Sequence, residues 1–438
     1  TEGTSGNPKL AFVRHPNNPE FYDFAPNGTR VGFGNVTQAD LNNNPNFYKE
    51  DVGGYLVRAA RWIMNETRCD GLRLDAVKHI PSYFFGQQSG AGKDTSDAGY
   101  VGNIQRQFNI THGYGDANHR DSSFDAEAVR DDALAFGEHL GEPPSFGEYI
   151  DSGMRLVDNP LRNYLNDVLG SPGRTLAGLD QRDFGGFSAP TRVMHAQSHD
   201  SDFAARRELQ NALYFMREGL ANIYSDGYNK SQTCRDSGGA FPRHANAPYL
   251  GEFGDNKMPD LVTLHQQLAR GGTRPRWSDS DIVAFERYDY REVATDPLNN
   301  PDATVVLFAM NDNYGFPGDT SFDDNVGQTT SGTFYECFPV ENSRGQGLVV
   351  GFPPGSVLVQ LADSPGKDRA CSKLLVRKAT NILSEADSTK NNADPIERKV
   401  YVGTQTLFPG GGGIEFKIPS GSYVLYAYQS PEAVRSGV

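Results

Sequence analysis

The stretch DGLRLDAVKH, residues 70–79, places four polar side chains at the end of a short apolar run. Side chains alternate between the two faces of a strand, so Arg73 and Asp75 point to the same side. A guanidinium stabilises the ionised form of a neighbouring carboxylate, and an ionised carboxylate held in a cleft can act as a nucleophile. From this strand alone, a structural ion pair explains the two residues equally well.

Two further carboxylates follow apolar runs, because Glu138 closes ALAFGE and Asp200 follows RVMHAQSH. Active sites of (β/α) barrels collect where strands end, so three strand ends would offer acids to one mouth. Glycoside hydrolysis needs such acids, one to protonate the leaving oxygen and one to stabilise or attack the anomeric carbon. Glu142 and Glu148 compete with Glu138 for the acid role, but neither closes an apolar strand.

Helices alternate with short apolar strands through the middle of the chain. Apolar spacing predicts a helix over 51–67, and the run from Cys69 to Leu74 is short enough to be a buried strand. Further strands are predicted at 132–138, 154–159, 191–197 and 220–226, and further helices at 203–217 and 258–270. This alternation predicts an α/β fold with a parallel sheet, either a (β/α) barrel or a doubly wound sheet.

From about Trp277 apolar and polar residues alternate between turns rich in Gly, Pro and Asn, which predicts an antiparallel β-sandwich. We expect this C-terminal domain to span 276–438. Residues 86–125 are rich in Gly, Ser and Asp and predict a long surface insertion. The two tryptophans, Trp62 and Trp277, are predicted to lie in the core or at a domain interface.

The formal net charge of −14 argues against nucleic acid or an anionic membrane as partner and suits a neutral or cationic ligand. No apolar run reaches the ~18 residues of a membrane span. The chain starts at Thr1 in a polar stretch, as processed proteins do, and we expect a secreted or periplasmic location. The four cysteines fit no zinc motif, and a disulfide between Cys337 and Cys371 stays open.

The chain resembles glycoside hydrolase family 13, the α-amylase family. GLRLDAVKH (71–79) matches the family's second signature region, G-x-R-x-D-x-x-K-H, at every fixed position. FGEHLGE (136–142) looks like the third region, SHDSD (198–202) like the fourth, and QADLNNN (38–44) like the segment that ends the B domain. The resemblance implies a (β/α)8 TIM barrel. Its parts would be a B-domain remnant at 1–45, strands four to eight at 46–275 with the insertion 86–125, and the C-terminal sandwich.

The resemblance also implies catalytic roles. Asp75 would be the nucleophile that forms a covalent glycosyl-enzyme, and Glu138 the general acid and then base. Asp200 would stabilise the distorted sugar and the oxocarbenium-like transition state, and Arg73 would orient Asp75. Together these roles describe a retaining α-amylase acting on the α-1,4-glucosidic bonds of starch-like glucans.

Binding roles follow from the same resemblance. His199 would hydrogen-bond sugar hydroxyls, and Lys78 and His79 would contact the glucan on the leaving-group side. A calcium ion would lie between the B domain and the barrel, bound by the Asp40 carboxylate and the main-chain carbonyl of His79. Oxygen ligands suit calcium.

Two departures keep other functions open. The family's first region, D-x-x-x-N-H, and the first three barrel strands have no counterpart, and Ser198 stands where an Asn often precedes the His-Asp pair. A transglycosylase or an α-glucosidase of the same family would share the catalytic residues. The missing strands also allow a glucan-binding protein without catalysis, or an enzyme that works only with a missing N-terminal fragment.

Overall fold

The computed structural model divides into two compact units, Thr1–Asn159 and Pro160–Val438. In the described part of the chain, no helix combines the length and the apolar character needed to cross a membrane. The structure describes residues 12–15, 18–24, 30–31, 48–49, 52–86, 99–113, 133–171, 174–179, 182, 184–198, 205–223, 258–288, 304–312, 335–337, 347–363, 373–382, 396–397, 399–419 and 421–428. The backbone alone is described at 12–15, 18–24, 30–31, 48–49, 52–55, 258–259, 335–337, 363, 417 and 419.

The first unit contains a small antiparallel sheet and a parallel one. The antiparallel sheet has the order β3-β2-β1-β4, with β1 (Phe12–His15), β2 (Asn18–Phe24), β3 (Arg30–Val31) and β4 (Tyr48–Lys49). The parallel strands are β5 (Gly71–Leu74), β6 (Leu134–Gly137) and β7 (Arg155–Val157), with β6 between the other two. The predicted strands at 69–74, 132–138 and 154–159 are therefore confirmed.

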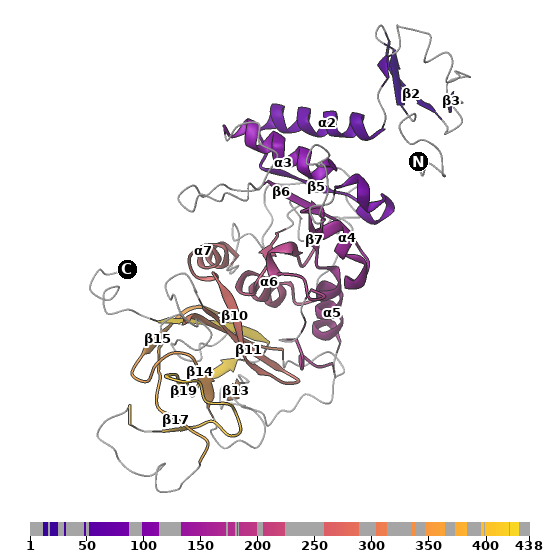
Figure 1. Cartoon of the computed structure of the whole chain (residues 1–438). Helices are drawn as coiled ribbons and strands as arrows, with labels where there is room; N and C mark the ends of the chain where they lie inside the picture. The colour runs from indigo at the N-terminus through magenta and orange to yellow at the C-terminus, as the bar shows by residue number, and fades with distance from the viewer. Residues whose placement is uncertain are drawn as a thin grey trace, which may run out of the picture. The chain divides into compact units, whose positions relative to one another are not determined.

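Two helices cover these parallel strands (Figure 1). Helix α2 (Val52–Thr67) packs on α3 (Gly99–Thr111), and α3 contacts both β5 and β6. Parallel neighbours require a crossover connection, and α3 belongs to the one that joins β5 to β6. The prediction of a surface insertion at 86–125 was therefore wrong for α3. Val101, Ile104 and Phe108 recur at helical spacing and are buried.

The second unit also contains a parallel pair, β8 (Arg192–Met194) and β9 (Leu220–Ala221), which confirms two more predicted strands. Its helices are α5 (Asn159–Gly170), α6 (Arg207–Met216) and α7 (Met258–Leu268). A six-stranded antiparallel sheet follows in the order β10-β11-β12-β21-β15-β16. Its strands are β10 (Gly272–Ser278), β11 (Ile282–Tyr288), β12 (Thr304–Asn311), β15 (Val357–Asp363), β16 (Lys373–Leu375) and β21 (Ser422–Tyr428).

Alternate residues of this sheet face two cores, as the strand periodicity requires. Val283 and Phe285 pack in the core that also holds residues of α5, α6 and α7, whereas Ile282 and Ala284 face the core on the opposite side. Three short strand pairs complete the unit. They are β13 (Tyr335–Cys337) with β20 (Lys417–Pro419), β14 (Leu348–Val350) with β19 (Gly412–Ile414), and β17 (Ala379–Thr380) with β18 (Val400–Tyr401).

The α/β class with a parallel and an antiparallel sheet is thus confirmed. The closed barrel, the sandwich and the domain boundaries at 45 and 275 stay predictions. Both tryptophans were predicted to lie in the core or at a domain interface. Trp277 is partly buried against the sheet core, as predicted, whereas Trp62 is exposed.

Candidate active site

Arg73 joins two carboxylates at the carboxyl ends of β5 and β6. Its Nη1 lies 2.6 Å from Oδ1 of Asp75, and its Nη2 lies 2.9 Å from Oε1 of Glu138. The sequence predicted that Arg73 orients Asp75, but it gave no sign that the same guanidinium also contacts Glu138. That contact depends on the pairing of β5 with β6, in which Arg73 faces Phe136 and Leu74 faces Gly137.

The main chain fixes Glu138 beside the turn that follows Asp75. The Glu138 N–H donates to the carbonyl of Leu74 over 2.8 Å, and the Val77 N–H donates to the carbonyl of Glu138 over 3.1 Å. Between Asp75 and Val77, Ala76 adopts the left-handed conformation with a φ of 48°. This conformation costs a non-glycine residue about 1 kcal/mol or more, so the pairing around it must hold the turn.

The three side chains remain accessible to a ligand to different degrees. Asp75 is 70% exposed, Arg73 is 32% exposed, and Glu138 is 12% exposed. When both acids are ionised, the cluster carries two negative charges and one positive charge. The cluster therefore presents one open and one largely enclosed carboxyl group.

Lys78 and His79, the predicted contacts to the glucan, are exposed on the short 3-10 helix η2 (Val77–His79), two to four residues beyond Asp75. The residues that follow η2 are held by hydrogen bonds to side chains outside the parallel strands. Ser82, in η3 (Ser82–Phe84), donates to Glu148 over 2.6 Å, and the Tyr149 hydroxyl donates to the carbonyl of Ile80 over 3.1 Å. Glu148 belongs to α4 (Gly147–Ile150), and its carboxylate accepts a hydrogen bond from Ser82, not from Arg73.

His139, directly after Glu138, is buried. Its Nδ1 accepts a hydrogen bond from the Gly141 N–H over 3.2 Å, and its ring meets Phe146 and Tyr149 edge-on. Burial lowers the pKa of His139, a backbone hydrogen bond partly opposes that shift, and the nearby positive charge of Lys78 adds the smallest effect by lowering the pKa further. His139 is thus a packing residue whose neutral form is favoured by burial.

The remaining predicted site residues, Asp200, His199 and Asp40, lie outside the described residues. Of the two predicted calcium ligands, only the main-chain carbonyl of His79 lies within the described residues. No group of three His, Cys, Asp or Glu side chains in the described part could hold a metal ion. Calcium takes about six to eight oxygen ligands, so the described residues alone do not fit it.

Comparisons with known proteins relate the chain to amylase-type enzymes at low identity. It is 23% identical over 296 residues to the Beta/alpha-amylase of Paenibacillus polymyxa, covering 61% of this chain and 22% of that protein. It is 25% identical over 277 residues to a cyclomaltodextrin glucanotransferase of a Bacillus species, covering 60% of this chain and 33% of that protein.

A shorter match, 32% identical over 80 residues, is to the cytoplasmic alpha-amylase of Escherichia coli and covers 17% of this chain and 16% of that protein. The chain thus spans a third or less of the length of each of these relatives. No family model matches the chain.

Proposed function

Because the chain is related to glycoside hydrolase family 13, the α-amylase family, we propose that it is a retaining glycoside hydrolase acting on starch-like α-1,4-glucans. The observation that carries the proposal is the Arg73 guanidinium, which holds Asp75 and Glu138 together at the ends of neighbouring parallel strands. Retaining enzymes need two carboxyl groups on opposite sides of one bond, about 5 Å apart. The (β/α)8 barrel predicted from the sequence belongs to the same proposal.

In the first step, an oxygen of Asp75 attacks the anomeric carbon and forms a covalent ester to the sugar. The bond from that carbon to the leaving oxygen breaks, and the Glu138 carboxyl gives its proton to that oxygen. In the second step, Glu138 removes a proton from water while the water oxygen attacks the anomeric carbon and releases Asp75. Asp200 has the proposed role of stabilising the transition state between these species.

The positions of the two acids suit these different roles. Asp75 is the more exposed acid, so a sugar can reach it, whereas Glu138 is largely enclosed. Arg73 contacts both acids and holds them beside one another. An ion pair with only a structural role is the alternative, but exposed pairs contribute little stability, typically 0–1 kcal/mol. The exposure of Asp75 therefore favours chemistry over support.

Transglycosylation is the second candidate, and the match to a cyclomaltodextrin glucanotransferase favours it. The covalent intermediate is the same, but a sugar hydroxyl replaces water in the second step. Product analysis distinguishes the two, because a hydrolase shortens maltoheptaose whereas a transglycosylase also yields longer or cyclic products. A catalytically silent glucan-binding protein would yield neither.

Glu138→Gln tests the acid role with two substrates. We expect a loss of about 10²–10⁴-fold on maltoheptaose, whose leaving group needs a proton, and a much smaller loss of the first step on α-maltosyl fluoride, whose leaving group does not. Glu142→Gln is the matched control, an exposed acid four positions further on, and should change neither rate by more than about twofold. Equal losses on both substrates for Glu138→Gln, or a Glu142→Gln defect of the same size, would reject the assignment.

We also propose that the protein binds a calcium ion. Asp40 and the His79 carbonyl would contribute two of the oxygen ligands, and binding would raise the melting temperature of the protein on titration with calcium after chelation. We propose a secreted or periplasmic location. The Escherichia coli relative is named as cytoplasmic, so fractionation of the source cells is the deciding measurement.

A further inference from the structure

Tyr149, on the short helix α4, contacts both of the loops that carry the proposed active site. Its hydroxyl donates to the main-chain carbonyl of Ile80, the residue that follows His79, over 3.1 Å. Its ring meets the ring of His139, the residue that follows Glu138, edge-on with 4.9 Å between the ring centres. One side chain thus links the turn after β5 to the loop after β6.

The helix that carries Tyr149 is anchored by a buried side chain. Phe146, three residues earlier, is fully buried and meets the His139 ring edge-on. The N–H groups of Tyr149 and Ile150 both donate to the carbonyl of Phe146 over 3.0 Å. Burial raises the pKa of the Tyr149 hydroxyl, and the negative charge of Glu148 raises it further, so the hydroxyl keeps its proton at neutral pH. Tyr149 is therefore a fixed hydrogen-bond donor.

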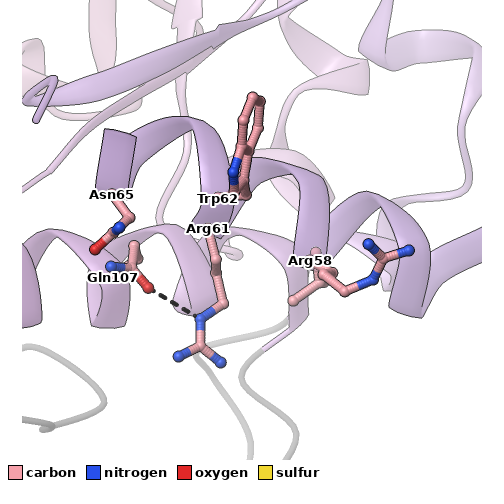
Figure 2. A pocket seen from close by; sticks show the side chains of 6 residues that line it. Arg58, Arg61, Trp62, Asn65 and Gln107 are labelled. Atoms are coloured by element: carbon pink, nitrogen blue, oxygen red, sulfur yellow. Dashed lines mark hydrogen bonds between the residues drawn. The ribbon is translucent and has the colours of Figure 1, made fainter. Parts of the chain in front are cut away.

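The residues that follow η2 are attached to α3 at their far end. The Val101 N–H, in α3, donates to the carbonyl of Phe85 over 3.1 Å. Helix α3 is in turn joined to α2, because the Arg61 Nε donates to Oε1 of Gln107 over 3.1 Å (Figure 2). The chain from β5 to Phe85 is thus held at both ends, and the hydroxyl of Tyr149 holds it in between.

We propose that Tyr149 is a positioning residue for the leaving-group side of the glucan. It holds Lys78 and His79, the proposed contacts to that part of the substrate, in a fixed position relative to Glu138, the proposed acid. The side chains of Lys78 and His79 are exposed, so the position of their main chain decides where they meet a sugar. Tyr149 acts through these residues and not on the substrate. The inference rests on the proposed function.

Tyr149→Phe removes the hydroxyl and keeps the ring against His139. Because it weakens binding of the leaving-group sugars in the ground state and the transition state alike, we expect the KM for maltoheptaose to rise about two- to tenfold and kcat to stay within about twofold. α-Maltosyl fluoride has no sugar on that side, so its kcat/KM should change less than about twofold. The matched control is Tyr164→Phe, which removes a hydroxyl that donates to the main-chain carbonyl of Thr175 and should change both substrates' constants less than about twofold.

A second readout does not depend on catalysis. In a protein that also carries Asp75→Asn, calorimetry gives the dissociation constant of maltoheptaose, which Tyr149→Phe should raise by the same factor as the KM. Hydrogen exchange of the main chain at 77–80 should be faster in Tyr149→Phe than in the original protein. Ser82→Ala removes the neighbouring hydrogen bond to Glu148, should raise the KM in the same direction, and serves as the second variant if urea unfolding shows that Tyr149→Phe is not folded.

Two kinetic results would overturn the inference. Equal losses on maltoheptaose and α-maltosyl fluoride would show general damage to the fold, and a lower kcat with an unchanged KM would place the effect on proton transfer by Glu138. Glucan binding that Tyr149→Phe weakens, without hydrolysis by the original protein, would reject the proposed function alone. Hydrolysis whose KM is the same in Tyr149→Phe would reject this inference alone, and a protein that neither binds nor hydrolyses maltoheptaose would reject both.

Discussion

Each unit contains a cluster of arginine and acidic side chains. One cluster has more acids than arginines, and the other has more arginines than acids. In the first unit, the acid-rich cluster places one arginine, Arg73, between the two carboxylates of Asp75 and Glu138. In the second unit, the base-rich cluster places one carboxylate between two arginines. Its members are Arg274, Arg276 and Glu286.

The base-rich cluster is closed to solvent. Glu286 is fully buried, its Oε2 lies 3.3 Å from Nη1 of Arg274 and 2.6 Å from Nε of Arg276, and its Oε1 accepts from the Gly351 N–H over 2.6 Å. The Phe408 ring lies 4.3 Å from the centre of the Arg274 guanidinium. Burial lowers the pKa of Arg274, and the attraction of Glu286 partly opposes that shift.

The two clusters differ in exposure, and we expect exposure, rather than the choice of residues, to separate a binding surface from a structural contact. Buried ions must keep their partners because removing one leaves an uncompensated charge. Exposed ions are solvated, lose little when a partner is removed, and remain available to a ligand. We therefore expect mutations of the acid-rich cluster to reduce activity and mutations of the base-rich cluster to reduce stability.

The largest effect is expected for Asp75→Asn. The amide cannot form the glycosyl ester, so kcat on maltoheptaose should fall by at least about 10⁴-fold. The free energy of unfolding should change by no more than about 1 kcal/mol, because Asp75 is largely exposed. Steady-state kinetics and urea unfolding of the same preparation measure both. Retained activity with lost stability would reverse the roles of the two clusters.

Glu286→Gln should give the largest loss of stability, about 3–5 kcal/mol, because two buried guanidinium groups lose their carboxylate. The matched control is Glu397→Gln, which removes an exposed ion pair with Lys378 in the same unit and should cost about 0–1 kcal/mol. Equal unfolding free energies for these two variants would remove the distinction by burial. At a temperature where Glu286→Gln is folded, its kcat should match the original protein.

The smallest effect concerns His139, beneath the acid-rich cluster. Burial lowers its pKa in the folded state, so the folded protein takes up its proton less readily than the unfolded chain. Stability should therefore be complete above the unfolded value of about 6.5 and decline as pH falls below it. His139→Asn, whose Oδ1 can replace Nδ1 as the acceptor for Gly141, should flatten this decline. Urea unfolding between pH 5 and 8 is the measurement, and an unaltered slope would contradict the assignment.

The sequence predicted where helices and strands lie better than it predicted which of them pack together. Apolar runs closed by polar residues located β5 and β6, and with them Asp75 and Glu138. Helix α3 was missed because the Gly- and Ser-rich residues around it hide a short amphipathic segment. Trp62 was misplaced because periodicity shows which residues share a face but not what covers that face.

The side-chain contacts within the two clusters were likewise not predictable from the sequence, because they depend on how strands pair. In the base-rich cluster, Arg274 faces Glu286 across β10 and β11, and the register shifts between Pro275 and Trp277. Neither the register nor the shift can be read from one sequence. The contact of Arg73 with Glu138 likewise required the pairing of β5 with β6. The predicted roles of Asp200 and His199 remain predictions, because these residues lie outside the described part of the chain.

Trapping the covalent intermediate would show directly whether Asp75 is the nucleophile. The purified protein is incubated with a 5-fluoroglycosyl fluoride, which forms the glycosyl-enzyme faster than water releases it, and is then digested and examined by mass spectrometry. We expect one added fluorosugar on the peptide that contains Asp75, and none in the Asp75→Asn variant. A label on Glu138, or an active enzyme that accumulates no label at Asp75, would contradict it.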